Sequence, residues 1–63
     1  MENLTRQDLL IIKTSLKFVM EDLANDLKKS IKTNDYDEID NDIQVLADYF
    51  VTLKKVVRGL RNE

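Results

Sequence analysis

The residues with the most chemistry to offer are the carboxylates that begin at Asp35. Five acidic residues fall within a short stretch: Asp35, Asp37, Glu38, Asp40 and Asp42. A calcium-binding EF-hand loop needs Gly at its sixth position and Glu at its twelfth. Counting from Asp35, these positions hold Asp40 and Leu46. The spacing therefore excludes an EF-hand.

Other reactive side chains lack the partners that they would need. The chain has no histidine and no cysteine, which removes the commonest general base, the commonest zinc ligand and any disulfide. Ser15 and Ser30 have no histidine to activate them as nucleophiles, and a di-iron bundle needs Glu-x-x-His pairs. We expect a chain that is not an enzyme and that binds no metal and no cofactor.

Two interpretations of the acidic stretch stay open. A row of carboxylates on a rigid helix could imitate the phosphates of a nucleic acid and occupy the groove of a basic partner. Acidic residues also stabilise the first turn of a helix, because they complement its dipole. The second interpretation accounts for most of these residues, and the first remains as an alternative function.

Length and charge limit the class of protein. At 63 residues there is room for one domain, and so short a chain needs a partner chain or unusually good helix packing when disulfides and metals are absent. The net charge of −2 gives no overall attraction to nucleic acid or to an anionic membrane. The early apolar run Leu9–Ile12 is too short for a signal peptide or a membrane span. We expect a cytoplasmic protein that does not associate with a membrane.

A first helix is predicted over residues 6–33. Thr5 suits the N-cap position, and Asp8, three residues later, suits the partner position of a capping box. The apolar residues that follow keep helical spacing: Leu9, Ile12, Leu16, Val19, Met20, Leu23, Leu27 and Ile31. A strict heptad register would place Ser30 between the helices. We therefore expect the apolar stripe to shift to Met20, Leu27 and Ile31, nearer the 3.6-residue period of a straight helix.

A second helix is predicted over residues 36–61, after a turn at 34–35. Asn34 suits a left-handed helix C-terminus, and Asp35 with Glu38 has the spacing of a second capping box. So short a connection makes the helices antiparallel. The predicted fold is an all-α, coiled-coil-like hairpin that forms a single domain.

The second helix carries steps of four and three residues, the pattern of a coiled-coil seam. The seam residues are Ile39, Ile43, Leu46, Phe50, Leu53, Val57 and Leu60. We expect these residues to form the core of the hairpin or of its dimer, together with Leu9, Ile12, Leu16, Leu23 and Leu27 of the first helix.

Six further apolar residues exceed what one hairpin can cover. Val45, Tyr49 and Val56 form a second stripe beside the seam, while Leu4, Ile11 and Phe18 are spaced by seven on the outer side of the first helix. Burying such a side chain stabilises a protein by roughly 1.5–3 kcal/mol. We therefore expect a homodimer built as a four-helix bundle, and we take these six residues as candidates for binding a partner.

The pattern indicates a small non-catalytic protein that binds another protein, as a regulator, an inhibitor or an adaptor. Its richness in Lys, Asn, Asp and Ile suits a bacterial or phage accessory protein. The alternative from another class is an RNA-binding hairpin dimer, whose plan this chain resembles in architecture alone. Basic residues for that role gather where the first helix begins and the second ends: Arg6, Lys13, Lys17, Lys54, Lys55, Arg58 and Arg61. The acidic pI of about 5.0 argues against nucleic acid.

Overall fold

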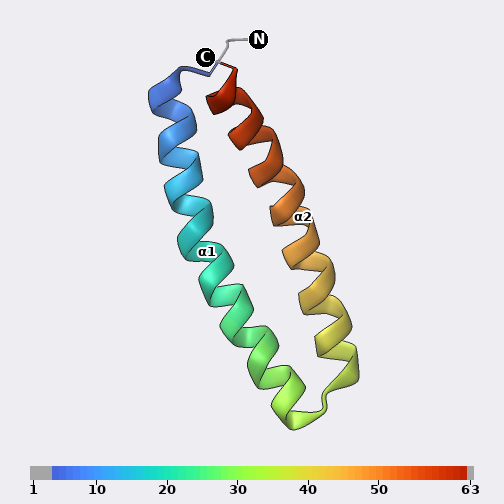
Figure 1. Cartoon of the computed structure of the whole chain (residues 1–63). Helices are drawn as coiled ribbons and strands as arrows, with labels where there is room; N and C mark the ends of the chain where they lie inside the picture. The colour runs from blue at the N-terminus through green and yellow to red at the C-terminus, as the bar shows by residue number, and fades with distance from the viewer. Residues whose placement is uncertain (1–3, 63) are drawn as a thin grey trace.

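The chain folds into two long antiparallel helices joined by a tight turn. The structure is a computed structural model that describes residues 4–62. Helix α1 spans Arg6–Thr33 and helix α2 spans Tyr36–Arg61, and no strand occurs among the described residues. Figure 1 shows the start of α1 and the end of α2 at the end of the hairpin opposite the turn. The predicted helical hairpin is confirmed, and the helix bounds are the predicted ones.

The N-terminus of α1 is held by the capping box that the sequence predicts. The Thr5 hydroxyl accepts a hydrogen bond from the Asp8 N–H at 3.1 Å. The Asp8 carboxylate accepts one from the Thr5 N–H at 3.0 Å. Two backbone donors that the first turn leaves without helical partners are therefore satisfied.

The turn is a Schellman motif. Asn34 lies in the left-handed region with φ 58°, and its N–H donates to the Ile31 carbonyl at 3.2 Å. The Asp35 N–H donates to the Ser30 carbonyl at 3.1 Å, and the Asp35 carboxylate accepts from the Glu38 N–H at 3.2 Å. The predicted second capping box is therefore only half formed, because the Asp35 N–H is bonded to Ser30 and not to the Glu38 side chain.

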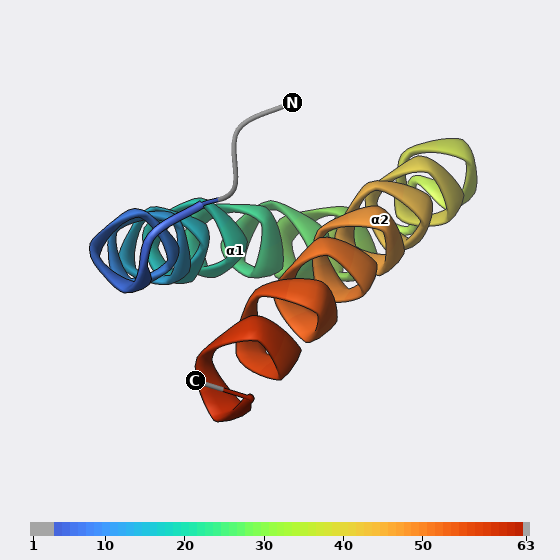
Figure 2. The same cartoon turned by 90° about the horizontal axis from the view of Figure 1, so that it is seen from above.

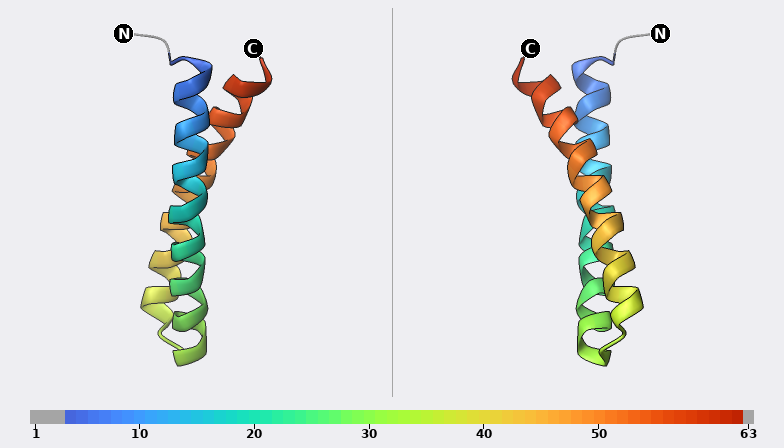
Figure 3. Two further views of the ribbon diagram at one scale, coloured as in Figure 1. Left: turned by 90° about the vertical axis from the view of Figure 1, so that its left-hand side faces the viewer. Right: turned by 90° about the vertical axis from the view of Figure 1, so that its right-hand side faces the viewer.

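The two helices pack around a small core. Leu9 and Leu16 of α1 and Val56 of α2 are its buried side chains, and five half-buried side chains surround them: Ile12, Met20, Tyr49, Leu53 and Leu60. Gly59 lets the helices approach at the open end, since a Cβ at that position would lie 3.0 Å from a methyl carbon of Leu9. Figures 2 and 3 show that the helices cross at an angle instead of lying parallel.

The structure corrects the predicted face of α2. The second stripe packs on α1: Val56 is 6% exposed, and Val45 and Tyr49 are half-buried. Three seam residues, Ile43, Phe50 and Val57, are exposed instead. The reason is that the apolar arc of α2 is wider than one helix can cover. The remaining seam residues of α2 are half-buried: Ile39, Leu46, Leu53 and Leu60.

The apolar stripe of α1 also departs from expectation near the turn. Met20 and Leu27 are half-buried while Val19 and Asp26 are exposed, so the expected shift away from a strict heptad register is confirmed as far as Leu27. Leu23 is half-buried as well. In the last turn Ser30 is buried and Ile31 is 54% exposed, so the expectation for Ile31 is wrong. A polar side chain can occupy this position because α2 supplies a hydrogen-bonding partner for it, as described below.

Candidate interaction surfaces

One broad face of the hairpin exposes apolar side chains from both helices. Met20, Ala24, Leu53 and Val57 line one groove between the helices, with a volume of about 700 Å³. Ile31 lies seven residues from Ala24, and Phe50 and Ile43 lie seven and fourteen residues from Val57, so helical spacing puts them on the same side of their helices as the groove. We call the surface formed by these seven residues the shared face. Phe50 is 58% exposed although it belongs to the strongest apolar pattern of the sequence. The hairpin alone leaves this face without a cover.

Charged side chains border the groove of the shared face. Lys13, Lys17 and Glu21 of α1 line its margin, and Phe18 of α1 lines the groove as well. The ammonium group of Lys17 lies 5.9 Å from the ring centroid of Phe18, within the range of a weak cation–π contact. An apolar floor with a charged margin is the general anatomy of a protein interface.

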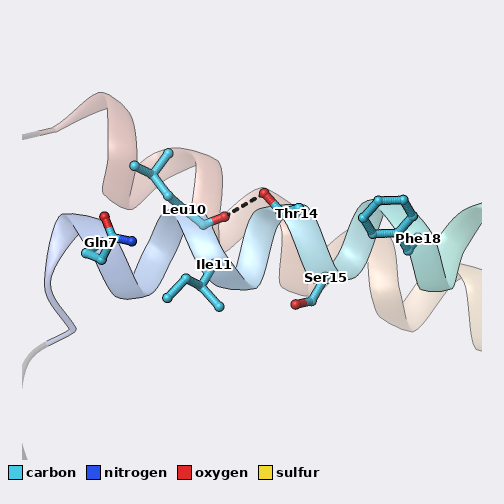
Figure 4. Close-up of a pocket in the computed structure, with 6 residues that line it drawn as sticks. All are labelled: Gln7, Leu10, Ile11, Thr14, Ser15 and Phe18. Carbon is cyan, nitrogen blue, oxygen red and sulfur yellow. Dashed lines mark hydrogen bonds between the residues drawn. The ribbon is translucent and has the colours of Figure 1, made fainter.

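A second apolar surface lies on the outer side of α1. We call it the outer stripe, and it consists of Leu4, Ile11 and Phe18, each more than half exposed. A shallow depression of about 360 Å³ runs along it, and the side chains that line it carry no charge: Gln7, Leu10, Ile11, Thr14, Ser15 and Phe18. Figure 4 shows these side chains on α1, with α2 behind the helix.

The polar groups of the outer stripe do not form a reactive site. The Thr14 hydroxyl donates to the Leu10 carbonyl at 3.0 Å, as the dashed line in Figure 4 marks. No titratable side chain lines this depression. The surface therefore offers apolar contact and a few hydrogen-bonding groups, which suits binding to another protein better than catalysis.

A buried polar pair joins the helices next to the turn. Ser30 of α1 and Asp42 of α2 are 7% and 5% exposed. The Ser30 hydroxyl lies 2.9 Å from an Asp42 carboxylate oxygen and 3.1 Å from the Asp26 carbonyl. The sequence suggested that Asp42 belongs to the row of carboxylates that begins at Asp35. The signal for its true position was the heptad register of Ser30, which faces Asp42 across the hairpin.

Asp42 perturbs the neighbouring carboxyl group of Glu38. A hydrogen bond to Asp42 and repulsion from its charge raise the pKa of Glu38 above the ordinary value of 4.5, with smaller contributions from Asp35 and Asp26. Among the described residues, no group of three or more acidic side chains has the geometry to hold a metal ion.

The open end of the hairpin is basic. Lys54, Arg58 and Arg61 line a depression of about 420 Å³ near the end of α2. Arg6 joins the helices at the same end, where its guanidinium group donates to the Leu60 carbonyl at 3.2 Å. The two ends of the hairpin therefore differ in charge, because the carboxylates that begin at Asp35 lie at the turn.

Comparison with known proteins gives no family for this chain: no family model, curated protein or solved structure matches it. Within the described part of the chain, neither helix combines the length and the apolar character needed to cross a membrane. The surfaces of the hairpin are therefore the basis for inferring what the protein binds.

Proposed function

We propose that the chain is a non-catalytic protein-binding module that acts as a homodimeric four-helix bundle. The observation that carries this proposal is the shared face. It spans both helices and exposes Ile31, Ile43, Phe50 and Val57 to solvent. A contiguous apolar surface of this kind on a small soluble protein marks an interaction site.

The small core of the single hairpin supports a second copy as the cover. Only Leu9, Leu16 and Val56 are buried apolar side chains among the described residues, which is little for independent stability at this length. Two hairpins packed through their shared faces would enclose the exposed seam residues of α2, Ile43, Phe50 and Val57, in a common core. Four-helix bundles achieve stability in this way.

The outer stripe is the proposed site for a different protein. Ile11 lines only the depression of the outer stripe, whereas Phe18 also lines the groove of the shared face. The part of the stripe around Ile11 would therefore stay open when the shared face is covered. Phe18 at its end is a large aromatic anchor that is 59% exposed, and aromatic anchors contribute much of the energy of protein interfaces. A regulator, inhibitor or adaptor would bind its target through this stripe.

Two matched substitutions test the division between the surfaces. Phe50→Asp places a charge within the shared face, and we expect it to convert the dimer into a monomer. Ile11→Asp places the same charge at a side chain of nearly equal exposure that does not line the groove of the shared face, and we expect it to leave the dimer intact. Solution mass by light scattering separates the outcomes. An Ile11→Asp variant that dissociates would place the outer stripe within the dimer interface.

The partner of the outer stripe can be sought by affinity capture and then measured with purified proteins. We expect Ile11→Asp to weaken binding of the purified partner at least about tenfold, the effect of losing a contact of about 1.4 kcal/mol. Val51→Asp is the control, since Val51 is an exposed apolar residue of α2 outside both surfaces. Equal weakening by both variants would argue against the outer stripe as the binding site.

A second candidate function is RNA binding through the basic open end. The side chains of Lys54, Arg58 and Arg61 share one depression there, and such clusters bind phosphates. RNA binding would give a retarded band at low salt that weakens steeply as salt rises. The absence of a shift at micromolar protein would refute it. Mimicry of nucleic acid by the acidic stretch is less favoured, because the buried Asp42 is not part of an outward row.

A further inference from the structure

We propose that the second copy lies on the shared face in the reversed orientation, with its turn beside the open end of the first copy. This inference rests on the proposed homodimer and names the arrangement of its two chains. Both the reversed and the same-end arrangement have twofold symmetry and present the same face from each copy. The apolar pattern of α2 and the distribution of charge decide between them.

The exposed seam residues of α2 are spaced symmetrically about Phe50. Ile43 and Val57 each lie seven residues from Phe50, and all three are exposed. When two copies of α2 cross antiparallel at Phe50, Ile43 of one copy meets Val57 of the other. Phe50 then meets its own counterpart on the twofold axis. The whole exposed ridge is covered by apolar side chains.

The same-end arrangement covers this ridge less well. There α2 would lie on α1 of the second copy, with the open halves of both helices at one level. Val57 would then face the part of α1 that carries Lys13 and Lys17, the two lysines at the margin of the groove. A lysine can cover apolar surface only with its aliphatic stem, because its ammonium group stays in water. The reversed arrangement replaces these lysines with Ile43.

The open half of the hairpin, residues 4–19 and 48–62, carries a positive charge. Its anionic side chains are Asp8 and Asp48. Its seven cationic side chains are Arg6, Lys13, Lys17, Lys54, Lys55, Arg58 and Arg61. Seven cations against two carboxylates leave this half strongly basic.

The turn half, residues 20–47, carries the opposite charge. Its cationic side chains are Lys28, Lys29 and Lys32. Its eight carboxylates are Glu21, Asp22, Asp26, Asp35, Asp37, Glu38, Asp40 and Asp42. A same-end dimer would bring together two acidic halves and two basic halves. A reversed dimer places each basic half beside an acidic one, and like charges across an interface are costly enough to select the orientation.

The reversed orientation has a consequence for the outer stripe. Two hairpins related by a twofold axis perpendicular to their length place α1 beside α1 of the second copy. Both outer stripes then lie on one side of the bundle and run in opposite directions. In a same-end dimer they would lie on opposite sides. The proposed protein-binding surface is therefore composite and is contributed by both chains.

Spin labels on single cysteines test the orientation in the full-length dimer. The chain has no cysteine, so Lys32→Cys labels the turn and Asp22→Cys labels the middle of the hairpin, both at exposed positions. The hairpin measures 43 Å along its length and 17–19 Å across. For the reversed dimer we expect a dipolar distance near 43 Å between labels at residue 32, and one near the 19 Å width for labels at residue 22.

Each other outcome contradicts a defined part of the account. A short distance at both labels would establish a same-end dimer and would overturn the orientation while keeping the homodimer. Long distances at both labels would mean contact outside the shared face and would also overturn it. The absence of dipolar coupling at both labels would mean a monomer, and the proposed homodimer would fail together with its orientation.

Discussion

Replacing Ser30 with alanine should destabilise the protein because it breaks the buried pair between the helices. The Ser30 hydroxyl lies 2.9 Å from the Asp42 carboxylate, and the two residues are 7% and 5% exposed. In Ser30→Ala the carboxylate keeps its burial and loses this donor. An unsatisfied buried group costs its desolvation penalty, which is larger for a charged group than for a neutral one.

We expect Ser30→Ala to lower the free energy of unfolding by about 2 kcal/mol, within the range for a hydrogen bond to a charged group. The total stability of a chain of this length is of the order of 3–9 kcal/mol. The loss corresponds to a decrease of roughly 8–16 °C in the melting temperature of so small a domain. The alanine also raises helix propensity, by about 0.5 kcal/mol, which offsets part of the loss.

The assay is thermal and urea unfolding followed by circular dichroism at one protein concentration, since dimer stability depends on concentration. Ser15→Ala is the matched control, because it makes the same change on the exposed side of α1 and should not destabilise. The double variant Ser30→Ala/Asp42→Leu removes both polar partners. It should recover much of the stability lost in Ser30→Ala, since apolar replacement of a buried polar pair is often neutral or favourable.

Two results would refute this reasoning. A Ser30→Ala variant as stable as Ser15→Ala would mean that the Asp42 carboxylate reaches water or another donor in solution. A double variant less stable than Ser30→Ala would mean that Asp42 contributes through contacts other than Ser30. A double-mutant cycle separates these cases, because it isolates the coupling between the two side chains.

Three further predictions follow from the electrostatics and the packing. The raised pKa of Glu38 means that the folded protein holds the carboxyl proton of Glu38 more tightly than the unfolded chain does. The contribution of Glu38 to the free energy of unfolding therefore falls as the pH rises above 4.5. Glu38→Gln should therefore raise the melting temperature at pH 7 and have no such effect well below pH 4.5; an equal or lower melting temperature at pH 7 would contradict this. Gly59→Val should lower the free energy of unfolding by about 1–3 kcal/mol through overpacking, because a methyl carbon of Leu9 lies 3.0 Å from the position of an added Cβ. The midpoint of urea unfolding measures this loss. An unchanged midpoint would show that the two helices lie farther apart at Gly59. Raising the salt concentration should weaken the reversed dimer, because salt screens the attraction between its acidic and basic halves. Sedimentation measures the dimer's dissociation constant, which should rise with salt. A dissociation constant that falls with salt would indicate that like-charged halves are adjacent.

Local signals in the sequence were sufficient to predict the two helices and their ends. Thr5 with Asp8 and the left-handed Asn34 each act within one turn of helix, so neighbouring residues determine what they do. The second capping box formed only in part because the N–H of Asp35 had a competing acceptor in Ser30.

The face of α2 that packs on α1 was not predictable from periodicity. Apolar residues cover about half of the helix, and both Val56 and Phe50 lie within that arc. Their exposed fractions, 6% and 58%, differ because α1 covers one side of the arc only. The hydrogen bond between Ser30 and Asp42 joins the two helices on the covered side, and the apolar periodicity of α2 alone does not indicate that contact. The outer stripe, by contrast, is local to α1, and its exposure agrees with its spacing.

The measurement that most directly tests the central claim is the solution mass of the wild-type protein across a hundredfold dilution, by light scattering. The claim is that a second copy covers the shared face. It requires a mass of twice 7.4 kDa that persists on dilution. A mass of 7.4 kDa at all concentrations, with the helical signal retained, would contradict it and would show that the single hairpin is stable with Phe50 exposed.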